Sequence, residues 1–219
     1  MVKICTLIIG DDYRKGLAKA LESKQRYANQ NSYTYIQGDE TFWDRSRPIS
    51  WSKIVFLQDV LSKCEENELV FVSDGDVYMT NMNMKLEEQV FSLLPQEKDL
   101  LLSIDACGHI NAGNFVIRNT EWSRDFLKRA YNQTDLIYHI WWDTAAFIKL
   151  LEENPSDLQK TELTTKHKLF NAYIQGLPNE PLWEPGDLLV HFAGIYDVDK
   201  MNKYIQEIDK GLVPRKSMY

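Results

Sequence analysis

The amino-acid sequence predicts an α/β fold with a mixed, mostly parallel β-sheet flanked by helices. Residues 2–9 form an almost unbroken apolar run rich in β-branched side chains, which is typical of a strand buried on both faces. A helical pattern at 13–30 and a second strand at 33–36 follow, and this opening indicates a Rossmann-like sheet with right-handed crossovers. With 219 residues, 44% of them hydrophobic, the chain suits one such domain.

The rest of the chain continues to alternate strands and helices. Pro48 precedes a helix with an apolar face, and Asn119 and Thr120 suit the start of another because their side chains can accept hydrogen bonds from free backbone amides. The predicted helices cover residues 49–63, 86–94, 120–131, 141–151 and 197–210. The predicted strands cover residues 68–72, 99–104, 114–118 and 187–192.

Composition and charge exclude several classes of partner. The chain has 25 Lys and Arg residues against 32 Asp and Glu, a formal charge of −7, and so lacks the basic surface that binds nucleic acid. A phosphorylated ligand would need a local positive charge, which a bound cation can supply.

No apolar stretch approaches the roughly 18–20 residues of a membrane span. The scattered Cys5, Cys64 and Cys107 indicate buried free thiols in a reducing compartment. We therefore expect a soluble, cytoplasmic chain.

Asp74 and Asp76 flank Gly75 directly after the predicted strand at 68–72. Ligands of open α/β sheets bind outside the carboxyl ends of strands, so this loop lies where chemistry is expected. Mg²⁺ and Mn²⁺ prefer carboxylate oxygens and leave positions open for substrate phosphates. An ordinary Asp-Gly turn is the alternative. His191, in the strand at 187–192, favours the metal interpretation as a third ligand, although a buried core histidine gives the same pattern.

Two further segments place polar side chains among small or aromatic residues. Asp105, Asn111, Ala112 and Gly113 lie in a predicted loop whose small residues allow close approach to a polyhydroxylated ligand. A polar turn between two strands would have the same composition. Asp143 follows two tryptophans at a predicted helix start, where it either favours the helix dipole or places a carboxylate beside a sugar.

Four sequence blocks occur in an order that is specific to one family. They are PISWSK at 48–53, VSDGD at 72–76, NAGNFVIRNTEWS at 111–123 and WEPGDLLVHFAG at 183–194. Together they resemble glycosyltransferase family 34, which has the GT-A fold and contains galactosyl-, xylosyl- and mannosyltransferases. The compact form without an anchor is also similar to the glycosyltransferase domain of chlorella-virus proteins that decorate the capsid, which implies the host cytoplasm. The resemblance implies one GT-A domain over residues 1–219, with a nucleotide-binding half up to about residue 110 and a donor-sugar and acceptor half from about residue 111 onward.

The resemblance also implies roles for individual residues. Asp74 and Asp76 would form an Asp-x-Asp motif that binds Mn²⁺, with Mg²⁺ as the alternative, and His191 would be the third protein ligand. Asp143 would be the catalytic carboxylate, although Thr144 stands where related enzymes carry Gln. The implied nucleotide-binding residues are Thr6, Ile8, Asp11, Tyr13, Lys53, Ser73, Gly75, Gly194 and Lys200. The implied donor-sugar-binding residues are Asp105, Asn111, Ala112, Gly113, Asp143 and Thr144.

The implied activity is a metal-dependent sugar transfer that retains the anomeric configuration. The donor would be a nucleotide diphosphate sugar, with UDP-sugars favoured, and the acceptor a glycan or glycoprotein. A sugar-nucleotide pyrophosphorylase is one alternative, but residues 10–16 only partly match the glycine-rich, basic phosphate loop of that class. A metal-dependent phosphohydrolase would need an early Asp-x-Asp, which Asp11 and Asp12 do not supply. A non-catalytic sugar-binding module could use the same tryptophans.

Overall fold

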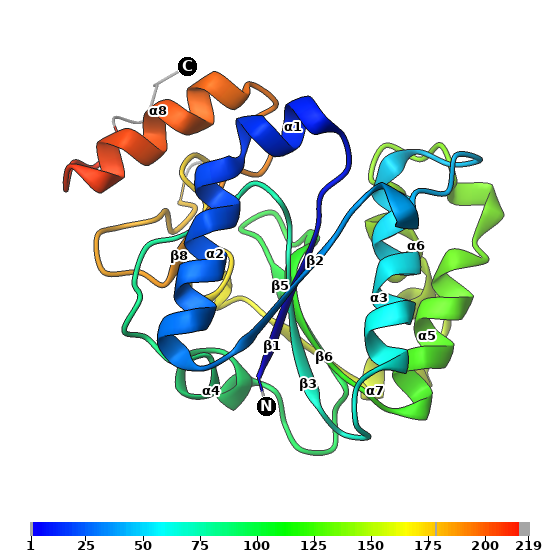
Figure 1. Ribbon diagram of the computed structural model, residues 1–219. Coiled ribbons are helices and arrows are strands. Elements are labelled where there is room, and N and C mark those ends of the chain that lie inside the picture. The colour runs from blue at the N-terminus through cyan, green and yellow to red at the C-terminus, as the bar shows by residue number, and fades with distance from the viewer. Residues whose placement is uncertain (1, 178, 215–219) are drawn as a thin grey trace.

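The computed structural model describes residues 2–177 and 179–214, in which a central sheet lies between two layers of helices (Figure 1). The strands of the central sheet are β1 Lys3–Leu7, β2 Thr34–Gly38, β3 Leu69–Ser73, β5 Leu100–Ile104, β6 Ile110–Arg118 and β7 Thr161–Thr164. The α-helices are α1 Asp11–Gly16, α2 Ala18–Asn31, α3 Ser52–Ser62, α4 Leu86–Gln89, α5 Glu121–Tyr131, α6 Trp142–Glu153, α7 Pro155–Gln159 and α8 Val198–Asp209. Short 3-10 turns cover Glu40–Phe42, Ile49–Trp51, Phe91–Leu93, Thr134–Leu136 and His167–Leu169.

The strand order of the central sheet is β2-β1-β3-β6-β5-β7. β1 pairs in parallel with β2 and β3, and β5 pairs in parallel with β7. β6 runs antiparallel to both of its neighbours, so every strand of this sheet except β6 points the same way. The prediction of a mixed, mostly parallel sheet flanked by helices is confirmed.

A second, two-stranded sheet positions the end of the chain against the acidic loop. It pairs β4 (Val77–Met79) with β8 (Leu189–His191) in antiparallel register, with Val77 opposite His191. Because β4 begins directly after Asp76, this register brings His191 to the loop.

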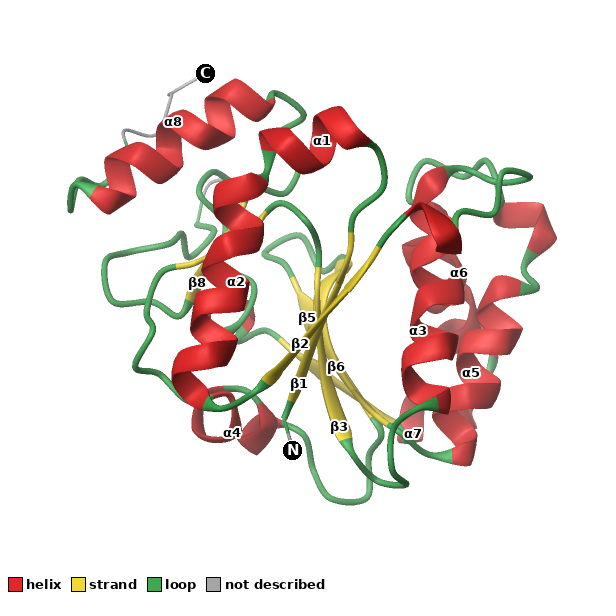
Figure 2. Cartoon of the chain, in the orientation of Figure 1, coloured by secondary structure: helices red, strands yellow, loops and turns green. Residues whose placement is uncertain are grey.

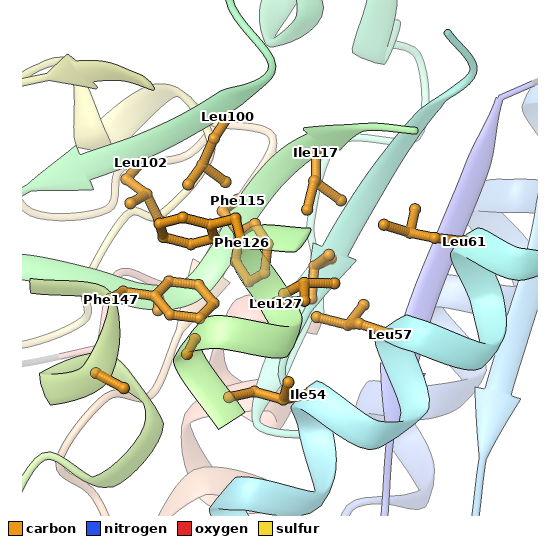
Figure 3. Packing of buried hydrophobic residues seen from close by; sticks show 14 of the residues in the cluster. Ile54, Leu57, Leu61, Leu100, Leu102, Phe115, Ile117, Phe126, Leu127 and Phe147 are labelled. Carbon is orange, nitrogen blue, oxygen red and sulfur yellow. The ribbon is translucent and has the colours of Figure 1, made fainter. Parts of the chain in front are cut away.

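Each face of the central sheet is covered by its own helices (Figure 2). Successive side chains of a strand point to opposite faces, so Val70 and Val72 of β3 pack on one side and Phe71 on the other. On the first face, α3, α5 and α6 bury residues such as Leu57, Phe126 and Phe147 against β5 and β6 (Figure 3). Tyr27 of α2 and Leu86 of α4 cover the second face. Each fully buried side chain of this size contributes about 1.5–3 kcal/mol.

The structure corrects several element boundaries. The helix predicted at 13–30 is broken at Leu17 into α1 and α2, and α1 packs against α8 so closely that a Cβ on Gly16 would lie 2.5 Å from Cγ1 of Val198. Residues 111–113, predicted in a loop, belong to β6, because β6 pairs with β5 as far as Ile110. The short strands β4 and β7 were not predicted. β4 has only three residues, and β7 is an edge strand that contains Glu162.

Cys5, Cys64 and Cys107 are free thiols, as predicted, but only Cys5 is buried. Cys64 is half-buried and Cys107 is exposed in the turn between β5 and β6, so the prediction of burial is wrong for Cys107. Among the described residues, no helix is long and apolar enough to cross a membrane.

Candidate active site

An open cleft of about 480 Å³ lies where β1 and β3 end and β6 begins. Its walls come from the loop after β3, the hairpin between β5 and β6, the start of α6 and the segment after β8. Most of the predicted site residues line it: Ile8, Tyr13, Lys53, Asp74, Gly75, Asp76, Asp105, Asn111, Ala112, Gly113, Asp143, Thr144, His191 and Gly194. The fold therefore gathers residues from both ends of the chain around one cavity.

Backbone hydrogen bonds fix the acidic loop at both ends. The Asp74 amide donates to the Gly113 carbonyl at 2.8 Å, and the Phe192 amide donates to the Asp76 carbonyl at 3.1 Å. One carboxylate oxygen each of Asp74 and Asp76 and one ring nitrogen of His191 all lie within 4.8 Å of one another. Two carboxylates and an imidazole are a donor set that fits Mn²⁺ or Mg²⁺.

Opposing effects act on the two carboxylates of this loop. Burial raises the pKa of Asp74 and outweighs the Lys53 ammonium, which acts to lower it. Burial also acts to raise the pKa of Asp76, but His191 and Lys24 outweigh it, so that this pKa lies below its usual value. Two buried carboxylates next to each other repel, and a divalent cation between them would remove that repulsion.

A chain of hydrogen bonds determines which nitrogen of His191 faces the acidic loop. The Gly113 amide donates to Oδ1 of Asn111 at 2.8 Å, so this oxygen must be an acceptor and must also accept from Nδ2 of Asn171 at 3.0 Å. Oδ1 of Asn171 then faces Nδ1 of His191 at 2.6 Å, and Nδ1 must carry the proton. Nε2, 3.5 Å from Asp76, is therefore the ring nitrogen that faces the acidic loop, where it would be available as a metal ligand.

Gly113 leaves the space in which these groups meet. A Cβ at this position would lie 2.4 Å from Cε1 of His191 and 3.1 Å from Oδ2 of Asp74. Any larger residue would push the imidazole or the carboxylate away, so the strand that supports the site needs glycine here.

Lys53 and Asp143 form an ion pair beside the acidic loop. Nζ of Lys53 lies 3.1 Å from Asp143, 3.2 Å from Asp74 and 3.0 Å from the Ala112 carbonyl oxygen. Burial acts to lower the pKa of Lys53, but Asp143 and Asp74 outweigh it and hold the pKa above its usual value. Asp143 is 4% exposed, and its carboxylate contacts Lys53 rather than free amides of α6. Asp143 also lies in the first turn of α6, where a carboxylate favours the helix dipole, so both interpretations of Asp143 stay open.

A second lysine supports the loop from behind. Lys24 of α2 is fully buried, and its Nζ donates to the carbonyl oxygens of Asp74 at 2.7 Å and Gly75 at 3.1 Å. Burial lowers its pKa to about 7, although Asp76 and Asp74 act to raise it. This contact holds the loop backbone in place without reaching the cleft.

Four predicted nucleotide-binding residues lie off the wall of the cleft. Thr6 and Ser73 are buried within β1 and β3. Asp11 is exposed and pairs with Arg14 at 2.8 Å, and Lys200 lies 3.4 Å from the Gln175 side chain. Their role in nucleotide binding stays a prediction.

Asn171 and Lys24 were not among the predicted site residues. The burial of Lys24 could have been predicted, because it lies at i, i+4 spacing between Ala20 and Ala28 on the buried face of α2. The burial of Asn171 could not have been predicted in this way, since it lies in an irregular segment between β7 and β8.

Comparison with known proteins decides the family. The profile of the galactosyl transferase GMA12/MNN10 family matches residues 92–201. The chain belongs to this family. One relative, an uncharacterized alpha-1,2-galactosyltransferase of Schizosaccharomyces pombe, is 26% identical over 80% of the chain. The chain spans 55% of that relative's length.

Solved structures show the fold of this family member. A glycosyltransferase involved in the glycosylation of the major capsid of PBCV-1 superposes with a TM-score of 0.72 and 14% identity, over 94% of this chain and 98% of that one. The galactosyltransferase LgtC, solved with donor and acceptor sugar analogs, gives a TM-score of 0.57 and 12% identity, over 98% of both chains. These neighbours are GT-A glycosyltransferases, so the GT-A fold predicted for the chain is confirmed.

Proposed function

We propose that this chain transfers a sugar from a nucleotide diphosphate donor, with UDP-sugars favoured, to a glycan or glycoprotein acceptor. The observation that carries the proposal is the convergence of Asp74, Asp76 and His191 in a cleft that also holds the Lys53–Asp143 pair. Membership of the galactosyl transferase GMA12/MNN10 family supports the transfer of a sugar. Retention of the anomeric configuration is part of the proposal.

Mn²⁺ is the proposed cofactor, with Mg²⁺ as the alternative. A bound cation would neutralise the charge that develops on the leaving diphosphate. Asp74, Asp76 and Nε2 of His191 would hold it, and Asn171 keeps the imidazole in the required tautomer. Gly113 provides the space for these ligands.

Other residues of the cleft would contact the two parts of the donor, its nucleotide and its sugar. Ile8 and Tyr13 follow β1, Gly194 follows β8, and all three line the cleft and would contact the nucleotide. Asp105 and Asn111 would contact the donor sugar. Such contacts orient the anomeric carbon for transfer.

Asp143 is the proposed catalytic carboxylate. Its side chain is held toward the cleft by Lys53, at 3.1 Å, so it can stabilise positive charge on the anomeric carbon. The acceptor hydroxyl would then approach from the side of the leaving group. In the alternative course, Asp143 would act as a nucleophile and form a covalent intermediate that the acceptor hydroxyl then displaces. Either course retains the configuration.

The family and the site favour a transferase over the alternatives. A sugar-binding module would not need three convergent metal ligands, and residues 11–16 form helix α1, with Gly10 before it, rather than a glycine-rich phosphate loop. The described residues therefore offer no support for a pyrophosphorylase.

Calorimetric titration of UDP and GDP, with Mn²⁺ and then with chelator, tests the proposal. We expect UDP to bind only when Mn²⁺ is present. Asp76→Asn should abolish this Mn²⁺-dependent binding of UDP, because it removes a charged metal ligand. Asp125→Asn, an exposed change on α5, is the matched control and should behave as wild type.

Each outcome of this titration has a separate meaning. Preference for GDP would indicate a GDP-sugar donor, and the chain would still be a glycosyltransferase. No binding of either nucleotide to the wild type would overturn the proposal, and wild-type binding by Asp76→Asn would overturn the metal site.

A further inference from the structure

An exposed apolar rim borders the cleft on the side of α6. In the segment between α5 and α6, Tyr138 is 82% exposed, Ile140 74% and Trp141 43%. Ile140, Trp141 and Trp142 line the cleft next to the buried Asp143. Large apolar side chains gathered around a polar site mark a surface that contacts a ligand.

The position of Trp141 is fixed by its neighbours. Its ring lies 5.2 Å from the His109 ring and 5.5 Å from the His139 ring, and its amide donates to Nδ1 of His139 at 3.1 Å. Trp142 has φ +43°, a left-handed conformation that is rare for a bulky residue. Backbone strain of this kind is concentrated at functional sites, and here it occurs between the exposed Trp141 and the buried Asp143.

A second hollow lies on the other side of Trp141. It has a volume of about 170 Å³, and its walls include His139, Ile148, Lys149 and Glu152. Trp141 lines this hollow as well as the cleft, so it forms a ridge between them. Lys149 pairs with Asp135 at 2.6 Å, so the hollow has no excess positive charge to attract an anion.

We propose that the acceptor is a neutral oligosaccharide of at least two sugars, whose terminal sugar lies in the cleft and whose next sugar crosses Trp141 into the second hollow. The proposal rests on the proposed transferase function. One face of a pyranose ring exposes C–H groups that pack on an aromatic ring, while its hydroxyls bond to polar groups such as Glu152. Lys53, the lysine that lines the cleft, is already paired with Asp74 and Asp143, so its charge is not available to attract an anionic acceptor.

Binding of glycans to the full chain tests this inference without requiring turnover. Saturation-transfer NMR and calorimetry would use methyl α-glycosides of mannose, galactose and glucose and the matching α-linked disaccharides, with Mn²⁺ and UDP present. We expect at least one disaccharide to bind about tenfold more tightly than its monosaccharide, because the second ring gains the Trp141 contact.

Three variants test whether the disaccharide advantage depends on Trp141 and the second hollow rather than on the loss of any exposed side chain. Trp141→Ala should remove the disaccharide advantage, and Glu152→Ala should reduce it while monosaccharide binding stays unchanged. Leu158→Ala removes an exposed apolar residue of α7 that lines neither cavity and should have no effect.

The outcomes distinguish this inference from the proposed function. Mono- and disaccharides of equal affinity, or a disaccharide advantage that survives Trp141→Ala, would overturn the inference even when UDP binds as expected. A disaccharide advantage that depends on Trp141, in a chain that fails to bind any nucleotide, would support the ridge and overturn the transferase.

Discussion

Two lysines approach the acidic loop from opposite faces of the sheet and contact different atoms. Lys53 of α3 contacts the carboxylates of Asp74 and Asp143, whereas Lys24 of α2 contacts the backbone carbonyls of Asp74 and Gly75. A buried ammonium is costly unless such groups compensate it. The loop is therefore held in one conformation before a ligand arrives, which is how a binding site is preorganised.

Asn171→Ala should weaken Mn²⁺ binding about 10- to 100-fold, because His191 loses the partner that fixes its tautomer. Asn119→Ala is the matched control, since Asn119 is also a buried amide and donates to the carbonyls of Cys64 and Glu65 away from the cleft. Both variants should lose about 1–3 kcal/mol of stability. Titration of Mn²⁺ followed by electron paramagnetic resonance checks the affinity, and equal affinities in the two variants would contradict the tautomer argument.

The segment before α3 is fastened to the end of α5. Asp44 contacts the Tyr131 hydroxyl and accepts hydrogen bonds from the amide of Ser46 at 2.8 Å and its hydroxyl at 2.6 Å. The Arg47 guanidinium lies 3.9 Å from the centre of the Tyr131 ring. Because α3 carries Lys53, these contacts between the segment before α3 and the end of α5 also help to position Lys53 in the site.

Asp44→Asn should lower the free energy of unfolding by about 1–2 kcal/mol at pH 7. The hydrogen bonds from Ser46 and Tyr131 lower the pKa of Asp44 to about 2, from a usual value of 3.8. A lowered carboxyl pKa stabilises the fold above about pH 4, and this contribution is lost as the pH falls toward 2. Urea unfolding at several pH values should show wild type and variant converging at low pH.

A constant difference between wild type and Asp44→Asn across this pH range would assign the effect to packing rather than to charge. Asp59→Asn is the control, because Asp59 forms only an exposed helical pair with Lys63. Its effect should stay within about 0.5 kcal/mol at every pH.

At the scale of the whole molecule, residues from both layers of helices form the walls of the cleft. Tyr13 of α1 lines one wall and Thr144 of α6 the other, and the sheet that carries the acidic loop lies between them. A ligand that fills the cleft binds only the folded chain, since these walls separate on unfolding. Ligand binding should therefore stabilise the entire fold.

UDP with Mn²⁺ at about 100 times its dissociation constant should raise the melting temperature by about 5–10 °C, which corresponds to about 2.7 kcal/mol for a chain of this size. Differential scanning calorimetry checks the shift. Chelator or Asp76→Asn should abolish it. A shift of equal size in the presence of chelator would show that nucleotide binding does not depend on the metal.

The sequence was sufficient for most of the local structure and for the composition of the cleft. Strand β1 is an apolar run of the kind that a strand buried on both faces requires, and amphipathic helices such as α5 have the periodicity of a half-buried element, so their positions were predictable. Asp74 and Asp76 at a strand end identified the acidic loop, because strand ends carry ligands in open sheets. The four ordered blocks pointed to the family that the profile match then showed.

Only the tertiary structure decided which of these groups meet and in what state. The pairing of β4 with β8 brings His191 to Asp76, the reversed strand β6 brings Gly113 to Asp74, and Asn171 joins them from an irregular segment. Local sequence determines periodicity and turn chemistry, because these depend on neighbours along the chain. Burial, tautomer and ion pairing depend on groups that are distant in sequence and that the fold alone makes adjacent.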